Sequence, residues 1–328
     1  MKWILAAIAL GAILFLGGSF FIEPEFVEVN PEQAVEENPQ PEQIKIILAG
    51  DVMLSRGVEY MIGKYGNGDF KFPFLKIADY LKDADIVFAN LEGPISDKGV
   101  RVGSIYSFRQ KPESIEGLTL AGFNVISLAN NHAFDYSREA LEDTFLRLNE
   151  SEISYVGAGF SESKAYSPLI KEINGAKIGF LAYTNLGPET WQAVGESSGI
   201  AWISENDFEK IKRDIKSAKE ISDVLIVSLH AGEEYQKTPA QFQIDFAKMA
   251  VDAGADLVVE HHPHVTQPFE KYLQGYIAYS LGNFIFDQSF SQETMESQII
   301  ELSIENKAIK EINLKEIKIN AFFQPEIK

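Results

Sequence analysis

The chain has 328 residues, a formal net charge of −19, 45% hydrophobic residues and no cysteine. This length allows one large α/β domain or two ordinary ones, with a sizeable core. The acidic charge argues against a nucleic-acid partner, which needs clustered Lys and Arg, and the lack of cysteine excludes disulfides, thiolate metal ligands and a cysteine nucleophile.

An apolar segment without charged residues begins the chain and covers residues 3–22. About 20 apolar residues suffice for a membrane-spanning helix, and Lys2 before the segment indicates a cytoplasmic N-terminus. We therefore expect residues 1–22 to be a transmembrane anchor that contacts the membrane through residues 3–22; a cleaved signal peptide is the alternative. The predicted localisation is the cell membrane, single-pass, with the globular domain extracytoplasmic.

An acidic, proline-rich stretch follows at residues 23–43. It contains seven Glu and four Pro but no Lys or Arg. Such a composition buries too little apolar surface to fold, so we predict a linker. The folded domain is expected to cover residues 44–328.

Short apolar runs alternate with amphipathic stretches along this domain. The candidate strands are Ile44–Ala49, Ile86–Ala89, Val125–Ala129, Lys177–Tyr183, Val224–Leu229, Asp256–Glu260 and Tyr276–Ser280. The candidate helices include Ser137–Asn149, Glu205–Glu220 and Thr238–Ala253. Nearly continuous apolar strands between helices predict a buried, layered α/β sheet. The tail from Ser297 to Ile319 alternates apolar and polar residues, which predicts a β-hairpin.

All five histidines lie at or just beyond the C-terminal end of a candidate strand: His132, His230, His261, His262 and His264. In open α/β sheets this edge is where ligands bind, so the bias favours a functional cluster over scattered structural histidines. Alternate residues of an extended segment point to one side, so His262 and His264 can bind a metal together.

Two acidic residues occupy the same predicted edge. Asp51 ends the first candidate strand and Glu92 follows the second. Alone, Asp51 can be a turn residue and Glu92 a surface charge. Carboxylate and imidazole ligands together suit Mn, Fe or Zn, so we predict a divalent metal ion of unknown identity as the cofactor.

Six ordered sequence blocks carry a family resemblance. They are Gly50–Arg56, Asn90–Pro94, Ala129–Asp135, His230–Tyr235, His261–Pro268 and Tyr279–Phe284. Over roughly residues 44–290 the chain resembles the poly-γ-glutamate capsule biosynthesis (CapA/PgsA) family, within the metallophosphoesterase-like superfamily. The resemblance implies a four-layer α/β/β/α sandwich of the calcineurin-like type.

The resemblance also implies roles for individual residues. The positions that match metal ligands are Asp51, Glu92, Asn131, His230, His262 and His264. His132 matches a histidine beside the leaving group, where it can act as a general acid that Asp135 orients. The candidate substrate-binding residues are Arg56, Arg109, Asn90, His261 and Glu233, the two arginines because Arg binds anionic groups in bidentate fashion. For Arg109 taken alone, a surface salt bridge is the simpler interpretation.

The sequence departs from the family pattern at two positions. A phosphoesterase begins Asp-x-His, but here Met53 occupies the histidine position. A thioether is a poor ligand for hard ions, which weakens or removes one of two metal positions. Glu260 replaces the glycine of Gly-His-His-Pro-His and either adds a ligand or replaces a turn residue.

Three functions remain open at this point. The first is a metal-dependent hydrolase or transferase that acts on a phosphoester. The second is an accessory module that binds an anionic polymer such as poly-γ-glutamate beside a membrane polymer synthase complex. The third is a degenerate hydrolase fold whose histidines no longer function. Metal content discriminates among all three.

Overall fold

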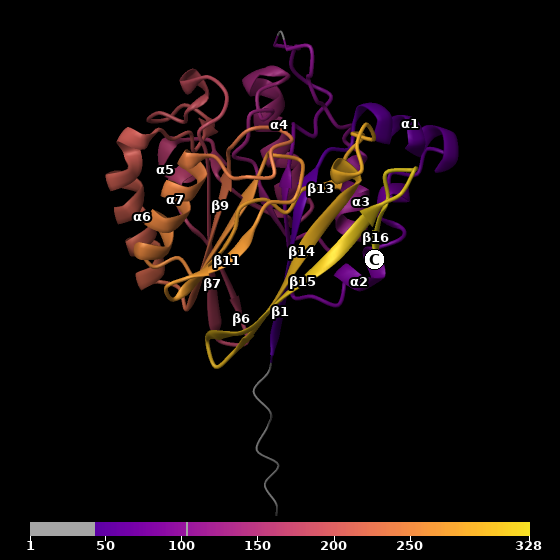
Figure 1. Cartoon of the computed structure of the whole chain (residues 1–328). Helices are drawn as coiled ribbons and strands as arrows, with labels where there is room; N and C mark the ends of the chain where they lie inside the picture. The colour runs from indigo at the N-terminus through magenta and orange to yellow at the C-terminus, as the bar shows by residue number, and fades with distance from the viewer. Residues whose placement is uncertain (1–42, 103) are drawn as a thin grey trace, which may run out of the picture. The chain divides into compact units, whose positions relative to one another are not determined.

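The computed structural model describes residues 43–102 and 104–328. Two β-sheets form the centre of the folded part, with helices on both outer sides (Figure 1). The first sheet has the strand order β16-β15-β14-β1-β2-β3-β4, with β13 also paired to β1. Its strands are β1 (Ile44–Val52), β2 (Ile86–Leu91), β3 (Val125–Ser127), β4 (Ser154–Val156), β13 (Asn283–Ile285), β14 (Glu296–Glu305), β15 (Ala308–Ile319) and β16 (Pro325–Ile327).

The second sheet has the order β11-β12-β10-β9-β7-β6. Its strands are β6 (Leu169–Ile173), β7 (Ala176–Thr184), β9 (Val224–His230), β10 (Leu257–His261), β11 (Phe269–Tyr272) and β12 (Gly275–Ala278). β7, β9, β10 and β12 run parallel, so their C-terminal ends meet at one edge. A small separate pair joins β5 (Ala158–Gly159) and β8 (Gly199–Ile200).

Helices cover the outer face of each sheet. The first sheet packs against α1 (Arg56–Tyr65), α2 (Ala78–Leu81), α3 (Ser114–Leu120) and α4 (Ser137–Glu150). The second packs against α5 (Glu162–Tyr166), α6 (Phe208–Glu220) and α7 (Gln241–Asp252). In α6 the buried residues are Ile211, Ile215 and Ala218, the spacing of one helical face.

The two sheets pack directly against each other. β1 places Ile46 and Leu48 between the sheets and turns Ile47 toward the helices, and Phe88 of β2 stacks on Phe180 of β7 with 5.8 Å between ring centroids. Both faces of β1 are therefore buried, which is why its sequence is nearly continuous in apolar residues. The predicted four-layer α/β/β/α sandwich is confirmed.

The predicted strands and helices are found close to their expected bounds. The predicted hairpin is confirmed as β14 and β15, and β14 pairs antiparallel with β1. Sequence patterns missed the shorter strands, such as β6 and β11, because edge strands with exposed faces lack long apolar runs.

The localisation prediction needs correction. Within residues 43–102 and 104–328, no helix has both the length and the apolar character needed to span a membrane. The predicted single-pass, extracytoplasmic membrane protein is therefore not retained. The predicted anchor at 1–22, and all of the predicted linker except Gln43, lie outside the described residues.

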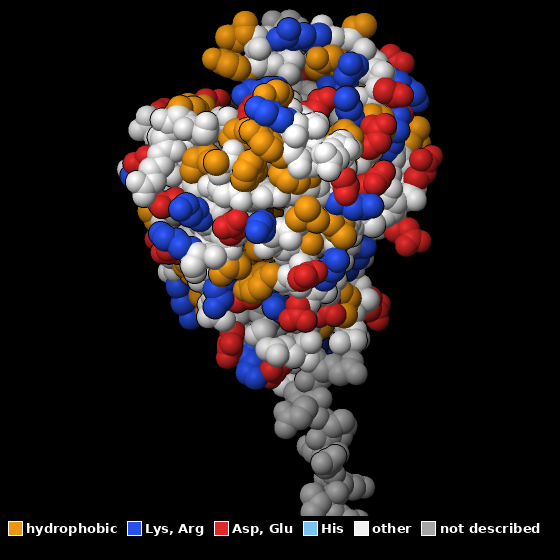
Figure 2. All heavy atoms as spheres, turned by 90° about the vertical axis from the view of Figure 1, so that its right-hand side faces the viewer, with side chains coloured by type: hydrophobic (Ala, Val, Ile, Leu, Met, Phe, Trp, Pro, Cys, Tyr) orange, Lys and Arg blue, Asp and Glu red, His pale blue; other side chains and the backbone are white. Residues whose placement is uncertain are grey.

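The face on the right-hand side of Figure 1 carries both signs of charge. Figure 2 shows Lys and Arg side chains interspersed with Asp and Glu and with apolar groups on this face. It therefore offers no extended surface of a single charge for a polyanion within the described part of the chain.

Candidate functional site

The C-terminal ends of strands from both sheets meet at one place. Asp51 is the penultimate residue of β1 and Glu92 follows β2 in the first sheet, whereas His230 ends β9 and His262 follows β10 in the second. The Asp51 Oδ2 atom accepts a hydrogen bond from the His262 backbone N–H at 3.2 Å and lies 3.6 Å from Nδ1 of His264. The predicted histidine–carboxylate cluster is therefore assembled across the two sheets.

Two groups of side chains place their donor atoms close together. In one group, Asp51, Glu92 and His230 each offer a donor atom within 4.8 Å of the others. In the other, Glu234, His262 and His264 do the same. The His264 Nε2 atom lies 3.7 Å from Oε1 of Glu92, so the two groups adjoin.

Several donor atoms of these groups are buried without a partner. Among the residues that the structure describes, neither carboxylate oxygen of Glu92 has a hydrogen-bond partner, nor has Nδ1 of His230 or of His262. Glu92 has no exposed surface, and burying a carboxylate without compensation is strongly unfavourable. A divalent cation would compensate it, so this donor set fits a metal ion.

Burial and neighbouring charges set the protonation of the cluster. Burial, followed by the charges of Asp51 and Glu234, raises the pKa of Glu92 well above its usual value. Burial alone would raise the pKa of Asp51, but His261 (Nδ1 3.5 Å from Oδ1) and the other histidines hold it below its usual range.

The pKa values of two of the imidazoles are lowered. Burial, and then the neighbouring His264, lowers the pKa of His262 to about 3. Burial and His262 likewise hold the pKa of His230 well below its usual value. Neutral imidazoles keep a free lone pair, which a metal ligand needs.

A second set of side chains orients the histidines. Asn131 Oδ1 lies 2.8 Å from Nε2 of His230, and Asn283 Oδ1 lies 3.0 Å from Nδ1 of His264. The latter bond makes Nδ1 the protonated nitrogen of His264 and leaves Nε2 free to face Glu92. Asn90 donates to Oδ1 of Asp51 at 2.8 Å.

His132 and Asp135 form a dyad beside this cluster. Nδ1 of His132 lies 2.7 Å from Oδ2 of Asp135, which also accepts a hydrogen bond from the Phe108 backbone at 2.6 Å. The Phe108 ring stacks on the imidazole with 4.0 Å between centroids, and Nε2 lies 3.6 Å from Oε1 of Glu92. The imidazole of His132 is thus held with its Nε2 atom toward the carboxylate of Glu92.

A cavity of about 510 Å³ opens at this cluster. Its lining includes Asn131, His132, Glu234, His264, Arg56 and Phe108, together with Tyr106, Tyr235 and Phe290. Arg56 forms two hydrogen bonds with the Asp287 carboxylate, at 2.8 and 3.1 Å. An anionic group that enters the cavity would therefore contact the guanidinium of Arg56, which is already paired with Asp287.

The other candidate substrate-binding residues do not line this cavity. Arg109 stacks on the Tyr136 ring at 4.1 Å, donates to the carbonyl of Lys98, and lines a different hollow. Asn90 and His261 are buried beneath the donor cluster. Glu233 is exposed and does not line the cavity.

Glu234 and Asn283 are residues near the donor cluster that sequence reasoning did not assign. Both stand in the sequence blocks described above, Glu234 directly beside Glu233. In a loop, neighbouring side chains do not alternate regularly between two sides. The sequence therefore indicated the block His230–Tyr235 but not which of Glu233 and Glu234 faces the donor cluster.

The two departures from the family pattern also have defined places. Met53 is buried in the core between the first sheet and its helices, and its sulfur accepts hydrogen bonds from the backbone and hydroxyl of Ser55. Glu260 lies under α7, where its Oε2 accepts from Gln243 at 2.8 Å. Burial raises the pKa of Glu260 well above its usual value. Both side chains have partners outside the two donor groups.

The chain is similar to proteins of a known family. The model of the family described as "Bacterial capsule synthesis protein PGA_cap" matches residues 45–288. "Capsule biosynthesis protein CapA" of Bacillus anthracis is 33% identical over 271 residues, covering 79% of this chain and 64% of that protein. "PGA biosynthesis protein CapA" of Bacillus subtilis (strain 168) is 30% identical over 280 residues, covering 83% and 70%.

A solved structure shares the fold. A hypothetical protein from Thermus thermophilus superposes with a TM-score of 0.51 at 17% identity, covering 84% of this chain and 99% of that one. The chain spans just under two thirds of the length of the Bacillus anthracis relative.

Proposed function

Because the chain belongs to the bacterial capsule synthesis protein family PGA_cap, we propose that it acts in the synthesis or export of a capsule-type polymer through a metal-dependent site. The family resemblance seen in the sequence is thereby confirmed. The names of the Bacillus relatives support poly-γ-glutamate or a related cell-envelope polymer as the material handled.

One observation carries the metal-dependent part of the proposal. Glu92 is fully buried, its two oxygens have no hydrogen-bond partner among the described residues, and imidazole nitrogens of His132 and His264 lie 3.6 and 3.7 Å away. Such an arrangement is costly unless a cation occupies the space between the donors. Asp51, Glu92, His230, His262 and His264 are side chains that would hold metal at this site.

The chain's own residues suit transfer of a phosphoryl or acyl group. When bound, a divalent cation polarises the substrate oxygen and lowers the pKa of a bound water. His132, aligned by Asp135, can deliver a proton from Nε2 to the leaving oxygen. Arg56 can bind an anionic group of the substrate after exchanging its contact with Asp287.

The test combines metal content with turnover in the full-length chain. Elemental analysis of the wild type should find Mn, Fe or Zn, and Asp51→Asn and His264→Ala should lose it. The wild type should hydrolyse bis(p-nitrophenyl) phosphate, whereas His132→Ala should keep its metal and lose about 10²- to 10⁴-fold in rate. Asp79→Asn, whose side chain is fully exposed, is the control.

The outcomes separate the candidate functions. If the wild type contains metal but does not hydrolyse the ester, the accessory function is favoured, in which the metal helps to bind an anionic polymer. A metal-free wild type that also fails to take up added Mn²⁺ or Zn²⁺ would refute the site and favour a degenerate hydrolase fold.

A further inference from the structure

We propose that Glu234 is a metal ligand that forms, with His262 and His264, a second cation position beside that of Asp51, Glu92 and His230. This inference rests on the metal-dependent site proposed above and concerns its composition. Glu234 is not among the ligand positions that the sequence indicated.

The side chain of Met53 does not face the donor groups. It has no exposed surface and packs in the core between the first sheet and its helices. Its sulfur accepts hydrogen bonds from the Ser55 backbone at 3.2 Å and from the Ser55 hydroxyl at 3.0 Å. Met53 is therefore committed to the core, and a donor in this region must come from elsewhere in the chain.

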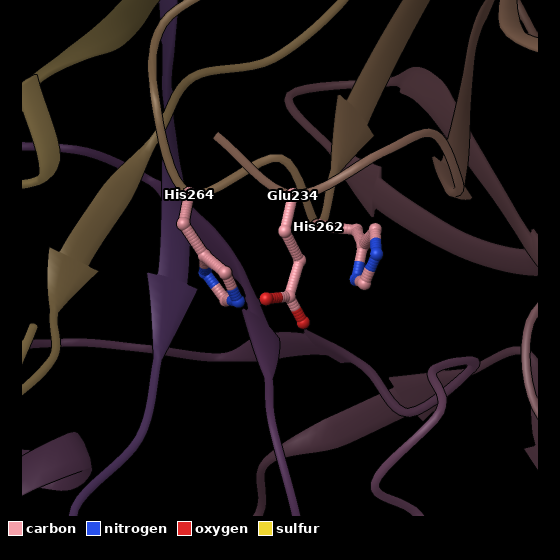
Figure 3. Close-up of side chains that lie close together, drawn as sticks. All are labelled: Glu234, His262 and His264. Atoms are coloured by element: carbon pink, nitrogen blue, oxygen red, sulfur yellow. The ribbon is translucent and has the colours of Figure 1, made fainter. Parts of the chain in front are cut away.

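Glu234 places a carboxylate beside two of the histidines. Figure 3 shows the Glu234 carboxylate between the imidazoles of His264 and His262, with all three side chains pointing to the same side. One donor atom from each of the three residues lies within 4.8 Å of the others. One carboxylate with two imidazoles is a donor set that Zn, Mn and Fe accept.

A buried atom without a partner points independently to a ligand here. The His262 residue is only 6% exposed, and its Nδ1 has no hydrogen-bond partner in the part of the chain that the structure describes. Arg56, the basic residue that lines the same cavity, is paired with Asp287 and not with Glu234. A cation between Glu234 and His262 would satisfy both groups.

The backbone holds the Glu234 loop against the histidine loop. The Tyr235 N–H donates to the carbonyl of Pro263 at 2.8 Å, between the two histidines of the pair. Gln267 donates to the carbonyl of Gln236 at 2.8 Å, so a second bond ties the same two loops together. The carboxylate is therefore carried by a segment whose position relative to His262 and His264 is set by direct hydrogen bonds.

Backbone strain is concentrated at the same residues. Tyr235, His262 and His264 have φ values of 64°, 100° and 59°, in the left-handed region that non-glycine residues rarely adopt. Such conformations are unfavourable for non-glycine residues, and strain of this kind persists where the surroundings hold it in place. Here it turns His262, His264 and the loop of Glu234 toward one another.

The experiment measures Mn²⁺ binding to the full-length, metal-depleted chain. Isothermal titration calorimetry gives the stoichiometry and the affinities, and electron paramagnetic resonance distinguishes a coupled Mn²⁺ pair from isolated ions. The variants are Glu234→Gln, which removes the charge but keeps the shape, and Glu233→Gln as the matched neighbour. Wild type and Glu233→Gln should bind two Mn²⁺ with a coupled spectrum. Glu234→Gln should bind one, or bind the second at least about tenfold more weakly, with a spectrum of isolated ions.

Three outcomes of the Mn²⁺ titration would contradict the second cation position. Two Mn²⁺ with unchanged affinity in Glu234→Gln, or a single Mn²⁺ in the wild type, would overturn the second position and leave the proposed function standing. No Mn²⁺ in the wild type would overturn both. If Glu234→Gln fails to fold, Glu234→Asp, which withdraws the carboxylate by one methylene, provides the same comparison.

Discussion

Individual buried side chains carry most of the information about this site. Glu92 has no exposed surface and no hydrogen-bond partner among the described residues, whereas Asp51 is equally buried but accepts bonds from Asn90 and from the His262 backbone. Burial, followed by the charges of Asp51 and Glu234, raises the pKa of Glu92, whereas at Asp51 His261 and the other histidines outweigh the effect of burial and lower the pKa. Environment and not residue type separates them.

The dyad of His132 and Asp135 leads to a prediction at this scale. Asp135 accepts from Nδ1 of His132 and so keeps Nε2 toward Glu92. Asp135→Asn should lower kcat for phosphodiester hydrolysis about 10- to 100-fold, with little change in KM or metal content, because ring orientation is lost and the ligands remain. Asp252→Asn, on the exposed side of α7, should match the wild type. A lower metal content in Asp135→Asn would mean that Asp135 supports the metal site and not the proton donor.

At the scale of elements, the close approach of two strand ends places Asp51. The Asp51 N–H donates to the Gly282 carbonyl at 3.1 Å, and β13 then pairs with the end of β1. A Cβ atom on Gly50 would lie 1.9 Å from the Gly282 oxygen, so only glycine fits there. The contact joins the first and the last sequence blocks.

Gly50→Ala should therefore destabilise the protein. Because the clash is with backbone, β1 and the Gly282 segment must separate, which we expect to cost about 2–3 kcal/mol in the free energy of unfolding. Gly63→Ala is the matched control: a Cβ there meets nothing within 4 Å in α1, and alanine should stabilise by about 0.5–1 kcal/mol. Urea denaturation of both variants measures the difference, and equal stabilities would contradict the proposed clash.

An ion-pair network around the buried Asp143 carboxylate fixes the segment after Glu92 to α4. Asp143 of α4 accepts from Ser96 and Arg147, both at 2.7 Å, and pairs with Lys98 at 2.8 Å. Burial alone would raise the pKa of Asp143, but these partners lower it below its usual value. The network thus contributes stability above the unfolded pKa of about 3.9, and this contribution is lost as the pH falls through the folded pKa.

Asp143→Asn should accordingly destabilise the protein in a pH-dependent way. We expect a loss of about 2 kcal/mol at pH 7, because hydrogen bonds to a charged group disappear, and a smaller loss at about pH 3. Denaturant unfolding at the two pH values measures both. The exposed Asp79→Asn should show no such dependence; a loss for Asp143→Asn that is equal at both pH values would rule out the ionic origin.

At the scale of the whole folded part, the candidate metal site joins the two sheets. Asp51 and Glu92 come from the first sheet, whereas His230, His262 and His264 come from the second. A cation bound by both sets would hold the sheets together at this edge in addition to the apolar contact between them. Ligand binding to the folded state alone also stabilises it by mass action.

Removal of metal should therefore lower the melting temperature. With free metal at about 100 times its Kd, binding contributes about 2.7 kcal/mol, or about 5 °C in Tm for a domain of this size. Calorimetry before and after chelation, then after Mn²⁺ is restored, measures the shift. Asp51→Asn should show a smaller shift than the wild type, and a wild type with the same melting temperature in all three states would contradict the cross-link.

The sequence by itself determined the layered fold and the residues that gather at one edge of it. Apolar runs and helical periodicity are local properties, and the ends of parallel strands necessarily meet, so Asp51, Glu92 and His262 were placed without knowledge of the strand order. Only the tertiary structure decided that Glu234 and not Glu233 faces the donors, that Asn283 orients His264, and that Arg109 lies away from the cavity. Those placements depend on loop backbones in unusual conformations and on contacts between distant segments, which no local periodicity encodes.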